Sequence, residues 1–147
     1  MLVPVSIREV MNPTVETISP DLGAAAVASL LHGEGIGSVV VVEDGEPAGI
    51  VTESDMVDIV AEGCDTEAVT AADCMSGPVV TVAADDTVER AVELFREHTI
   101  KKLPVVDDGS LVGIVTTTDV SYYLPHFARR GRSEEHTSGT PVTRTYL

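Results

Sequence analysis

The sequence is poor in aromatic residues and almost free of lysine. Of its 147 residues, 3% are aromatic and none is tryptophan, and lysine occurs only at positions 101 and 102. Aliphatic side chains therefore have to build the core, and the hydrophobic fraction of 44% is large enough for one. This length fits one compact domain or two small domains that depend on each other.

Positive charge is also scarce. Nine lysine and arginine residues face 24 aspartate and glutamate residues, which gives a net charge of −15. Such a field repels phosphate backbones and anionic lipids, so we expect neither a nucleic-acid nor a membrane partner. This acidity resembles that of proteins adapted to high salt, and an ordinary acidic cytosolic protein remains the alternative.

Long apolar runs are missing as well. None approaches the roughly 20 residues that are needed to span a bilayer, and the start, MLVPVSIREVM, does not have the regions of a signal peptide. We therefore expect a cytoplasmic protein. Cys64 and Cys74 form neither a CxxC pair nor a Cys/His set, so we expect buried or incidental thiols and no metal site.

What the chain does contain is a tandem repeat. A shift of 64 residues aligns residues 11–55 with residues 75–119 without a gap, and 15 of these 45 pairs are identical. The identical pairs include an Asp-Gly pair and the string GIVT. A repeat this regular predicts two copies of one supersecondary unit.

Each copy is expected to open with a short helix and an extended segment. Ser6 and Glu9 have the spacing of a capping box, which predicts a helix start near Ser6, and the counterpart is expected near Thr70. Extended segments follow at residues 14–18 and 79–83.

A longer helix is expected next in each copy, over residues 21–35 and 86–99. In the second of these helices, apolar residues recur at helical spacing. Asp86 and Glu89 form another cap signature there, so Asp86 is predicted to cap this helix.

The strongest local signal in each copy is a hairpin. An Asp-Gly pair, at residue 44 and again at residue 108, separates valine-rich segments and predicts a tight turn. A final helix is expected to start at Glu53 and at Thr117. The predicted order is therefore β-α-β-β-α in each copy, an α/β (α+β) fold with a lead-in helix.

The predicted boundaries are residues 1–62 for the first repeat, 63–125 for the second and 126–147 for a tail. A unit of about 60 residues is marginal alone, so we expect the two sheets to pack about a pseudo-two-fold axis. The tail is rich in Ser, Thr, Gly and Arg, and we expect it to be flexible.

This organisation resembles a tandem pair of cystathionine-β-synthase (CBS) domains, a Bateman module. The resemblance rests on SVVVVEDGEPAGIVTESD at 38–55 and LPVVDDGSLVGIVTTTD at 103–119, and it covers roughly residues 5–125. It implies a regulatory, energy-sensing module whose clefts bind AMP, ADP, ATP or S-adenosylmethionine. It also implies a homodimer and an unidentified regulated protein.

The strand-to-helix junction of each repeat has two interpretations. Thr52-x-x-Asp55 and Thr116-x-x-Asp119 have the spacing of a helix cap. A helix N-terminus can also bind phosphate, and a carboxylate can accept from the two hydroxyls of a ribose. Spacing alone leaves both interpretations open. The resemblance implies ligand contacts at Thr52, Ser54 and Asp55 and at Thr116, Thr118 and Asp119.

Lys101 and Lys102 precede the second hairpin, where the first repeat has Gly37 and Ser38. A charged strand start or a lysine-protected edge strand would explain them. Because the family often directs basic residues here toward phosphates, we expect the cleft of Asp119 to prefer a phosphorylated ligand. The cleft of Asp55 is expected to be empty or to prefer a less charged nucleoside.

The base of such a ligand needs an apolar slot. By the resemblance, the cleft of Asp119 takes this slot from Thr17, Ile18, Ile36 and Gly37. The cleft of Asp55 takes it from Thr81, Val82 and Ile100. The alternative is that the apolar members of both sets are core residues.

Catalysis is not expected, because the sequence has no GxSxG, HExxH or Walker pattern. No cofactor is expected beyond the regulatory ligand. The alternative function is a structural or partner-docking dimerisation module with empty clefts, which differs from the first only in ligand binding.

Overall fold

The predicted order of elements is confirmed. The computed structural model describes residues 4–77 and 79–123, so the predicted tail, residues 126–147, lies outside the described residues. The first repeat contains β1 (Thr17–Ile18), α2 (Ala24–Glu34), β2 (Ser38–Glu43), β3 (Glu46–Thr52) and α3 (Glu53–Ala61). The second contains β4 (Val82–Ala83), α5 (Val88–His98), β5 (Lys102–Asp107), β6 (Ser110–Thr116) and α6 (Thr117–Ser121). The lead-in helices are α1 (Ile7–Val10) and α4 (Ala71–Cys74).

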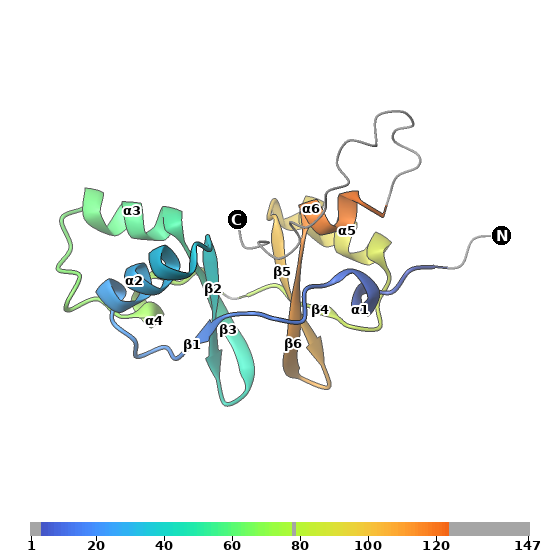
Figure 1. Cartoon of the computed structure of the whole chain (residues 1–147), viewed down its shortest axis with the longest axis horizontal. Helices are drawn as coiled ribbons and strands as arrows, with labels where there is room; N and C mark the ends of the chain where they lie inside the picture. The colour runs from blue at the N-terminus through green and yellow to red at the C-terminus, as the bar shows by residue number, and fades with distance from the viewer. Residues whose placement is uncertain (1–3, 78, 124–147) are drawn as a thin grey trace.

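Each repeat builds a three-stranded sheet, in the order β1-β2-β3 and β4-β5-β6. In both sheets the first strand runs parallel to the middle strand, and the two hairpin strands are antiparallel. Figure 1 shows the two sheets in the middle of the molecule and the helices on the outer sides. The two halves are related by an approximate two-fold axis, as the repeat predicts.

The hairpin turns follow the prediction from the Asp-Gly pairs. Both residues of each turn have positive φ, 55° and 82° at Asp44 and Gly45 and 57° and 84° at Asp108 and Gly109. This conformation matches the twist of the flanking strands, and Asp-Gly adopts it at little cost.

The helix starts that were predicted near Ser6 and Thr70 are confirmed, and the capping box predicted at Ser6 is present, with a second one at Thr70. The predicted cap at Asp86 is wrong, because α5 begins after Thr87, whose Oγ1 accepts a hydrogen bond from the Arg90 amide (3.3 Å). Asp86 belongs to the preceding turn instead. Its amide donates to the Ala83 carbonyl (3.0 Å), and its own carbonyl accepts from Ile7 (2.8 Å).

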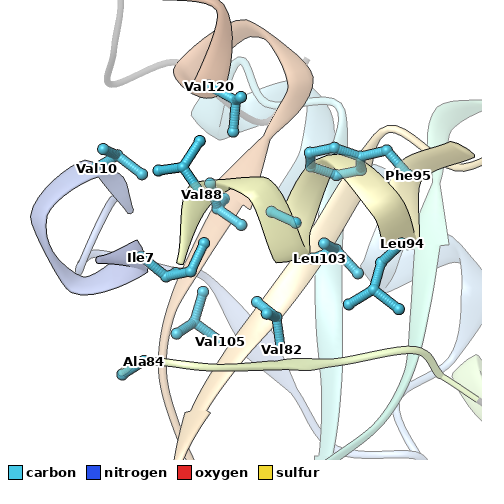
Figure 2. Packing of buried hydrophobic residues seen from close by; sticks show 12 residues of the cluster. Ile7, Val10, Val82, Ala84, Val88, Leu94, Phe95, Leu103, Val105 and Val120 are labelled. Atoms are coloured by element: carbon cyan, nitrogen blue, oxygen red, sulfur yellow. The ribbon is translucent and has the colours of Figure 1, made fainter. Parts of the chain in front are cut away.

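The lead-in helices are exchanged between the repeats. Ile7 and Val10 of α1 are buried in the core of the second repeat, beside α5 (Figures 1 and 2). In the matching arrangement α4 lies against the first repeat, where the Ala71 amide donates to the Leu22 carbonyl (2.8 Å). The packing units therefore cross the boundaries that the sequence repeat predicts, and those boundaries stay a prediction.

Two glycines permit the close approach of the exchanged segments. A methyl group on Gly113 would lie 2.7 Å from Met11 Sδ and 2.8 Å from the Asn12 carbonyl oxygen. On Gly49 it would lie 2.5 Å from Met75 Sδ. The glycine of each GIVT string is thus required by the segment that leads into the other repeat.

The two cores also meet between the sheets. Ile114 of β6 is fully buried, and it packs in the core of the first repeat. Strands β3 and β6 contact each other across this boundary. Each repeat therefore covers apolar surface of the other, which a unit of this size needs for stability.

Candidate functional site

The duplicated junction forms the same capping box in both repeats. The Thr52 amide donates to Asp55 Oδ2 (2.7 Å), and the Asp55 amide donates to Thr52 Oγ1 (3.3 Å). In the second repeat the Thr116 amide donates to Asp119 Oδ2 (2.9 Å), and the Asp119 amide donates to Thr116 Oγ1 (3.1 Å). The capping interpretation of both motifs is therefore confirmed.

Burial distinguishes the two junctions. Asp119 is 5% exposed and Thr116 is 4% exposed, whereas Asp55 and Thr52 are only partly buried. Burial raises the pKa of Asp119, and the hydrogen bonds from Thr116 offset this shift only in part. The second junction thus holds an enclosed carboxyl group, and the first holds one that water reaches.

The capping box uses one carboxylate oxygen of each aspartate, Oδ2. Oδ1 lies outside the box. An ionised carboxylate can accept about four hydrogen bonds, so capping leaves acceptor capacity for a ligand hydroxyl. Ser54 and Thr118, the other hydroxyl residues that were predicted at these junctions, are exposed.

Lys102 lies on the same face of its sheet as the second junction, because it pairs directly with Thr116 across the β5–β6 hairpin. Burial lowers the pKa of Lys102, and the nearby charge of Glu53, from the first junction, opposes this shift. Lys102 is therefore within electrostatic reach of both junctions. Lys101 is exposed, and its carbonyl accepts from the Thr117 amide (3.0 Å).

The residues predicted for the base slots divide into core and surface. Ile18 and Ile36 are buried in the first core, and Val82 is buried in the second, with Ile100 packed against it. Ile18, Ile36 and Val82 are therefore core residues and Ile100 is partly buried, and contact of these side chains with a base stays a prediction. Thr17 is exposed and Thr81 is partly buried.

Gly37 is buried, and its carbonyl accepts from the Glu53 amide (3.0 Å). This bond joins Gly37 to the junction of its own repeat. The predicted association of each base slot with the junction of the opposite repeat stays a prediction.

The structure adds one residue that the sequence did not single out for ligand contact. Ser38 is 1% exposed, and its Oγ has no hydrogen-bond partner in the described part of the chain. The only sequence signal was its alignment with Lys102. A hydroxyl in a strand is normally read as a surface group, and only the packing shows that this one is enclosed.

Other kinds of site find little support in the described ranges. Within residues 4–77 and 79–123, no group of three or more His, Cys, Asp or Glu side chains could hold a metal ion. Among the same residues, no helix is long and apolar enough to cross a bilayer. Cys64 is exposed and Cys74 is partly buried, and both are free thiols.

The chain is similar to known proteins over most of its length. The family model of the CBS domain matches residues 7–62 and again residues 71–126. The uncharacterized protein MK0525 of Methanopyrus kandleri is 45% identical over 125 residues, which cover 83% of this chain and 64% of that protein, just under two thirds of its length. The CBS domain-containing protein YhcV of Bacillus subtilis is 32% identical over 117 residues, covering 79% of this chain and 83% of that protein.

A solved structure has the same fold. The CBS domain pair of protein MJ0100, in complex with 5′-methylthioadenosine and S-adenosyl-L-methionine, matches with a TM-score of 0.73. It is 24% identical, and the match covers 82% of this chain and 96% of that chain. At this identity the likeness shows the fold, which is that of a CBS domain pair.

Proposed function

The chain belongs to the CBS-domain family, and we propose that it is a regulatory module that binds an adenosine-containing ligand between its repeats. In this proposal the ligand is AMP, ADP, ATP or S-adenosylmethionine, and its binding modulates a partner protein. The module itself carries out no catalysis.

The buried carboxyl group of Asp119 carries this proposal. Its Oδ2 is engaged by the helix cap, and its Oδ1 is free of the cap and suited to the hydroxyls of a ribose. Lys102 lies on the same sheet face and supplies positive charge for a phosphate. An acidic chain that places a lysine at this junction favours an anionic ligand there.

The solved relative supports the ligand class. Both molecules in the MJ0100 complex are adenosyl compounds. They share an adenine base and a ribose with the adenine nucleotides and differ in the 5′ substituent. The base and ribose are therefore the parts of the ligand that we propose to be common.

A thermal-shift panel tests the proposal. AMP, ADP, ATP, adenosine and S-adenosylmethionine are added to the full chain, because a ligand that binds only the folded state must raise the melting temperature. Mass spectrometry of the native protein checks for a co-purified nucleotide. If none of these ligands shifts the transition at any salt concentration, the module is not an adenosyl sensor.

Variants separate ligand binding from helix capping. We expect Asp119→Ala to weaken nucleotide affinity about tenfold or more, since it removes a charged hydrogen-bond acceptor. Lys101→Ala combined with Lys102→Ala is expected to weaken AMP more than adenosine. If Asp119→Ala lowers the free energy of unfolding and leaves nucleotide affinity intact, the aspartate serves only as a cap.

Exposed apolar residues favour the alternative function, a docking module. Ligand binding and docking are compatible in one module. In the described residues, Val57 and Val60 on α3 are 65% and 70% exposed, and Tyr122 and Tyr123 after α6 are 43% and 46% exposed. Apolar surface is therefore exposed on α3 in the first repeat and directly after α6 in the second. We propose that a second copy of the chain covers both ends to form a homodimer.

Analytical ultracentrifugation tests the dimer. The double variant Val57→Glu/Val60→Glu places charge on the exposed face of α3, and it is expected to yield monomers with an unchanged far-UV circular dichroism spectrum. Glu67→Gln is a matched control on an exposed residue elsewhere. A monomeric wild-type protein would contradict the proposal.

A further inference from the structure

The exposed face of α3 is apolar along one stripe and acidic beside it. Val57 and Val60 are 65% and 70% exposed, and they lie three residues apart, so they are neighbours on the helix surface. Glu53, Asp58 and Glu62 are exposed as well, and the helix contains no basic residue. The face therefore combines an apolar patch with carboxylates that have no cation on the same helix.

The matching end of the second repeat is apolar and lacks these negative charges. Residues without a carboxylate stand at the positions that match the three acids at the offset of 64 residues: Thr117, Tyr122 and His126. Tyr122 and its neighbour Tyr123 are 43% and 46% exposed. Because a tyrosine hydroxyl can donate a hydrogen bond to a carboxylate, this end suits an acidic surface better than α3 itself does.

Positive charge follows directly in the sequence. The nine residues after Tyr123, LPHFARRGR at 124–132, lie outside the described residues, and they contain three arginines and no acidic residue. Nine residues span at most about 30 Å when extended, whereas a helix of nine residues such as α3 is about 14 Å long. The chain is therefore long enough to bring these arginines to the carboxylates of an α3 that is docked on the tyrosines.

Two copies related by a two-fold axis can bring these faces together in two ways. In self-pairing, α3 contacts α3 of the second copy, so the three carboxylates of one helix meet those of the other. In cross-pairing, α3 of each copy contacts the end of α6 in the other, where the tyrosines and the arginines are. Within one chain α3 and α6 lie on opposite halves, separated by the two sheets (Figure 1), so cross-pairing requires a second copy. Charge complementarity favours cross-pairing, since juxtaposed like charges suppress association.

We propose that the homodimer is cross-paired. The valines of α3 in one copy pack on the two tyrosines after α6 in the other, and the arginines of residues 124–132 bind the carboxylates of α3. This inference rests on the proposed homodimer and assigns its orientation. The two-fold axis repeats the contact, so the dimer has two equivalent interfaces of this kind. The acidic face of α3 and the arginine segment together determine which faces pair.

Disulfide cross-linking of the full chain distinguishes the two arrangements. Val57→Cys and Tyr123→Cys are made separately in a Cys64→Ser/Cys74→Ala background, and the background protein without an added cysteine is the control. We expect neither variant to cross-link alone and an equilibrated mixture of the two to form a covalent dimer. If either variant cross-links alone, this inference is overturned and the homodimer stands. A dimer in which no combination cross-links has another interface, and it overturns the inference as well.

Charge reversal supplies a second readout, the dissociation constant of the dimer from sedimentation equilibrium. Asp58→Lys/Glu62→Lys places lysines opposite the arginines, and it is expected to raise Kd about tenfold or more. Arg129→Glu/Arg130→Glu/Arg132→Glu is expected to act in the same direction. Both sets of changes in one chain should return Kd to within about threefold of wild type, because opposite charges face each other again.

The same measurement has two contrary outcomes. Self-pairing predicts no loss in Asp58→Lys/Glu62→Lys, because two lysine faces repel each other as two acidic faces do. An unchanged Kd in that variant would therefore overturn the orientation and leave the homodimer in place. A wild-type chain that is monomeric would contradict the homodimer and its orientation together, and α3 would then serve a different partner.

Discussion

The two repeats of this chain share one backbone and differ in what surrounds their strand-to-helix junctions. Both sheets have the same order and the same bulge positions, and both final helices begin with a Thr–Asp capping box. The second junction encloses its aspartate and has lysines, whereas the first is more open and more acidic. A duplicated fold can therefore keep its geometry while its two sites diverge in charge.

The largest expected difference in the free energy of unfolding is between alanine variants of the glycines in the two GIVT strings, Gly49 and Gly113. The three atoms nearest to a methyl group on Gly113 include a backbone atom, the Asn12 carbonyl oxygen, whereas the three nearest to one on Gly49 all belong to the Met75 side chain. We expect Gly113→Ala to lower the free energy of unfolding by about 2–3 kcal/mol and Gly49→Ala by about 1 kcal/mol. Urea denaturation measures both, and Met75→Ala should rescue only Gly49→Ala. Equal losses would show that the two contacts are equally rigid.

The second largest difference in stability is expected between variants of the two capping aspartates, Asp119 and Asp55. Asp119→Ala leaves the buried amide of Thr116 unpaired, whereas water can replace Asp55 at the half-open first junction. The expected losses in unfolding free energy are about 2 kcal/mol for Asp119→Ala and about 1 kcal/mol for Asp55→Ala. Urea titration of the ligand-free protein measures them. A larger loss in Asp55→Ala would mean that burial does not determine how much the cap contributes to the free energy of unfolding.

The enclosed carboxyl of Asp119 also predicts a dependence on pH. Because burial raises its pKa in the folded state, the folded protein holds this proton more tightly than the unfolded chain does. The stability from this group is present below the ordinary carboxyl pKa and is lost as the pH rises through the raised value. The advantage of wild type over Asp119→Asn should therefore shrink as the pH rises above about 4, the ordinary pKa of an aspartate. If the difference in unfolding free energy between the two proteins stays constant as the pH rises, the prediction is contradicted.

A smaller difference is expected where the long helices end. Gly35 and Thr99 are equivalent C-caps in the left-handed conformation, with φ of 67° and 54°. A β-branched residue is strained there, so Thr99→Gly is expected to raise the free energy of unfolding by about 0.5–1 kcal/mol. The reciprocal Gly35→Thr should lower it by a similar amount. Thermal denaturation of both variants measures the pair, and a loss in Thr99→Gly would show that the threonine makes a compensating contact.

The smallest effect is expected at Arg8, which makes two ion pairs and has no charged match in the other repeat. Arg8 on α1 contacts Asp85 and Asp107, both at 3.1 Å and all exposed. The matching residue on α4 is Ala72. Arg8→Ala should lower the melting temperature slightly in dilute buffer and not at about 1 M salt, where charges are screened within about 3 Å. Ala72→Arg should act in the opposite direction; a shift in Arg8→Ala that persists in high salt would point to packing instead.

Local signals predicted much of the fold. The Asp-Gly turns and the capping boxes depend on residues close in the chain, so they could be read from spacing. The cap of α5 was misplaced by one residue, because the Asp86 carbonyl is held by α1, a segment distant in sequence. Contacts across that separation leave no local pattern.

The local features of the candidate site were predictable from the sequence, and the features that depend on packing were not. The Thr–Asp spacing predicted the caps, and the alignment predicted an asymmetry in lysine. It could not show that Ser38 is enclosed, or that Lys102 lies within reach of Glu53 in the other repeat. Both facts are properties of the folded chain and leave no pattern in residue spacing.

By itself, the sequence determined that the chain is a duplicated β-α-β-β-α unit. Turns and caps depend on residues close in the chain, and the 64-residue offset is found by aligning the sequence with itself. Only the tertiary structure decided that α1 serves the second core, that α4 serves the first, and that Ile114 is buried across the boundary. A small unit gains burial by exchanging segments with an equivalent neighbour. Because the repeats present matching surfaces, their sequences alone do not say which helix packs on which sheet.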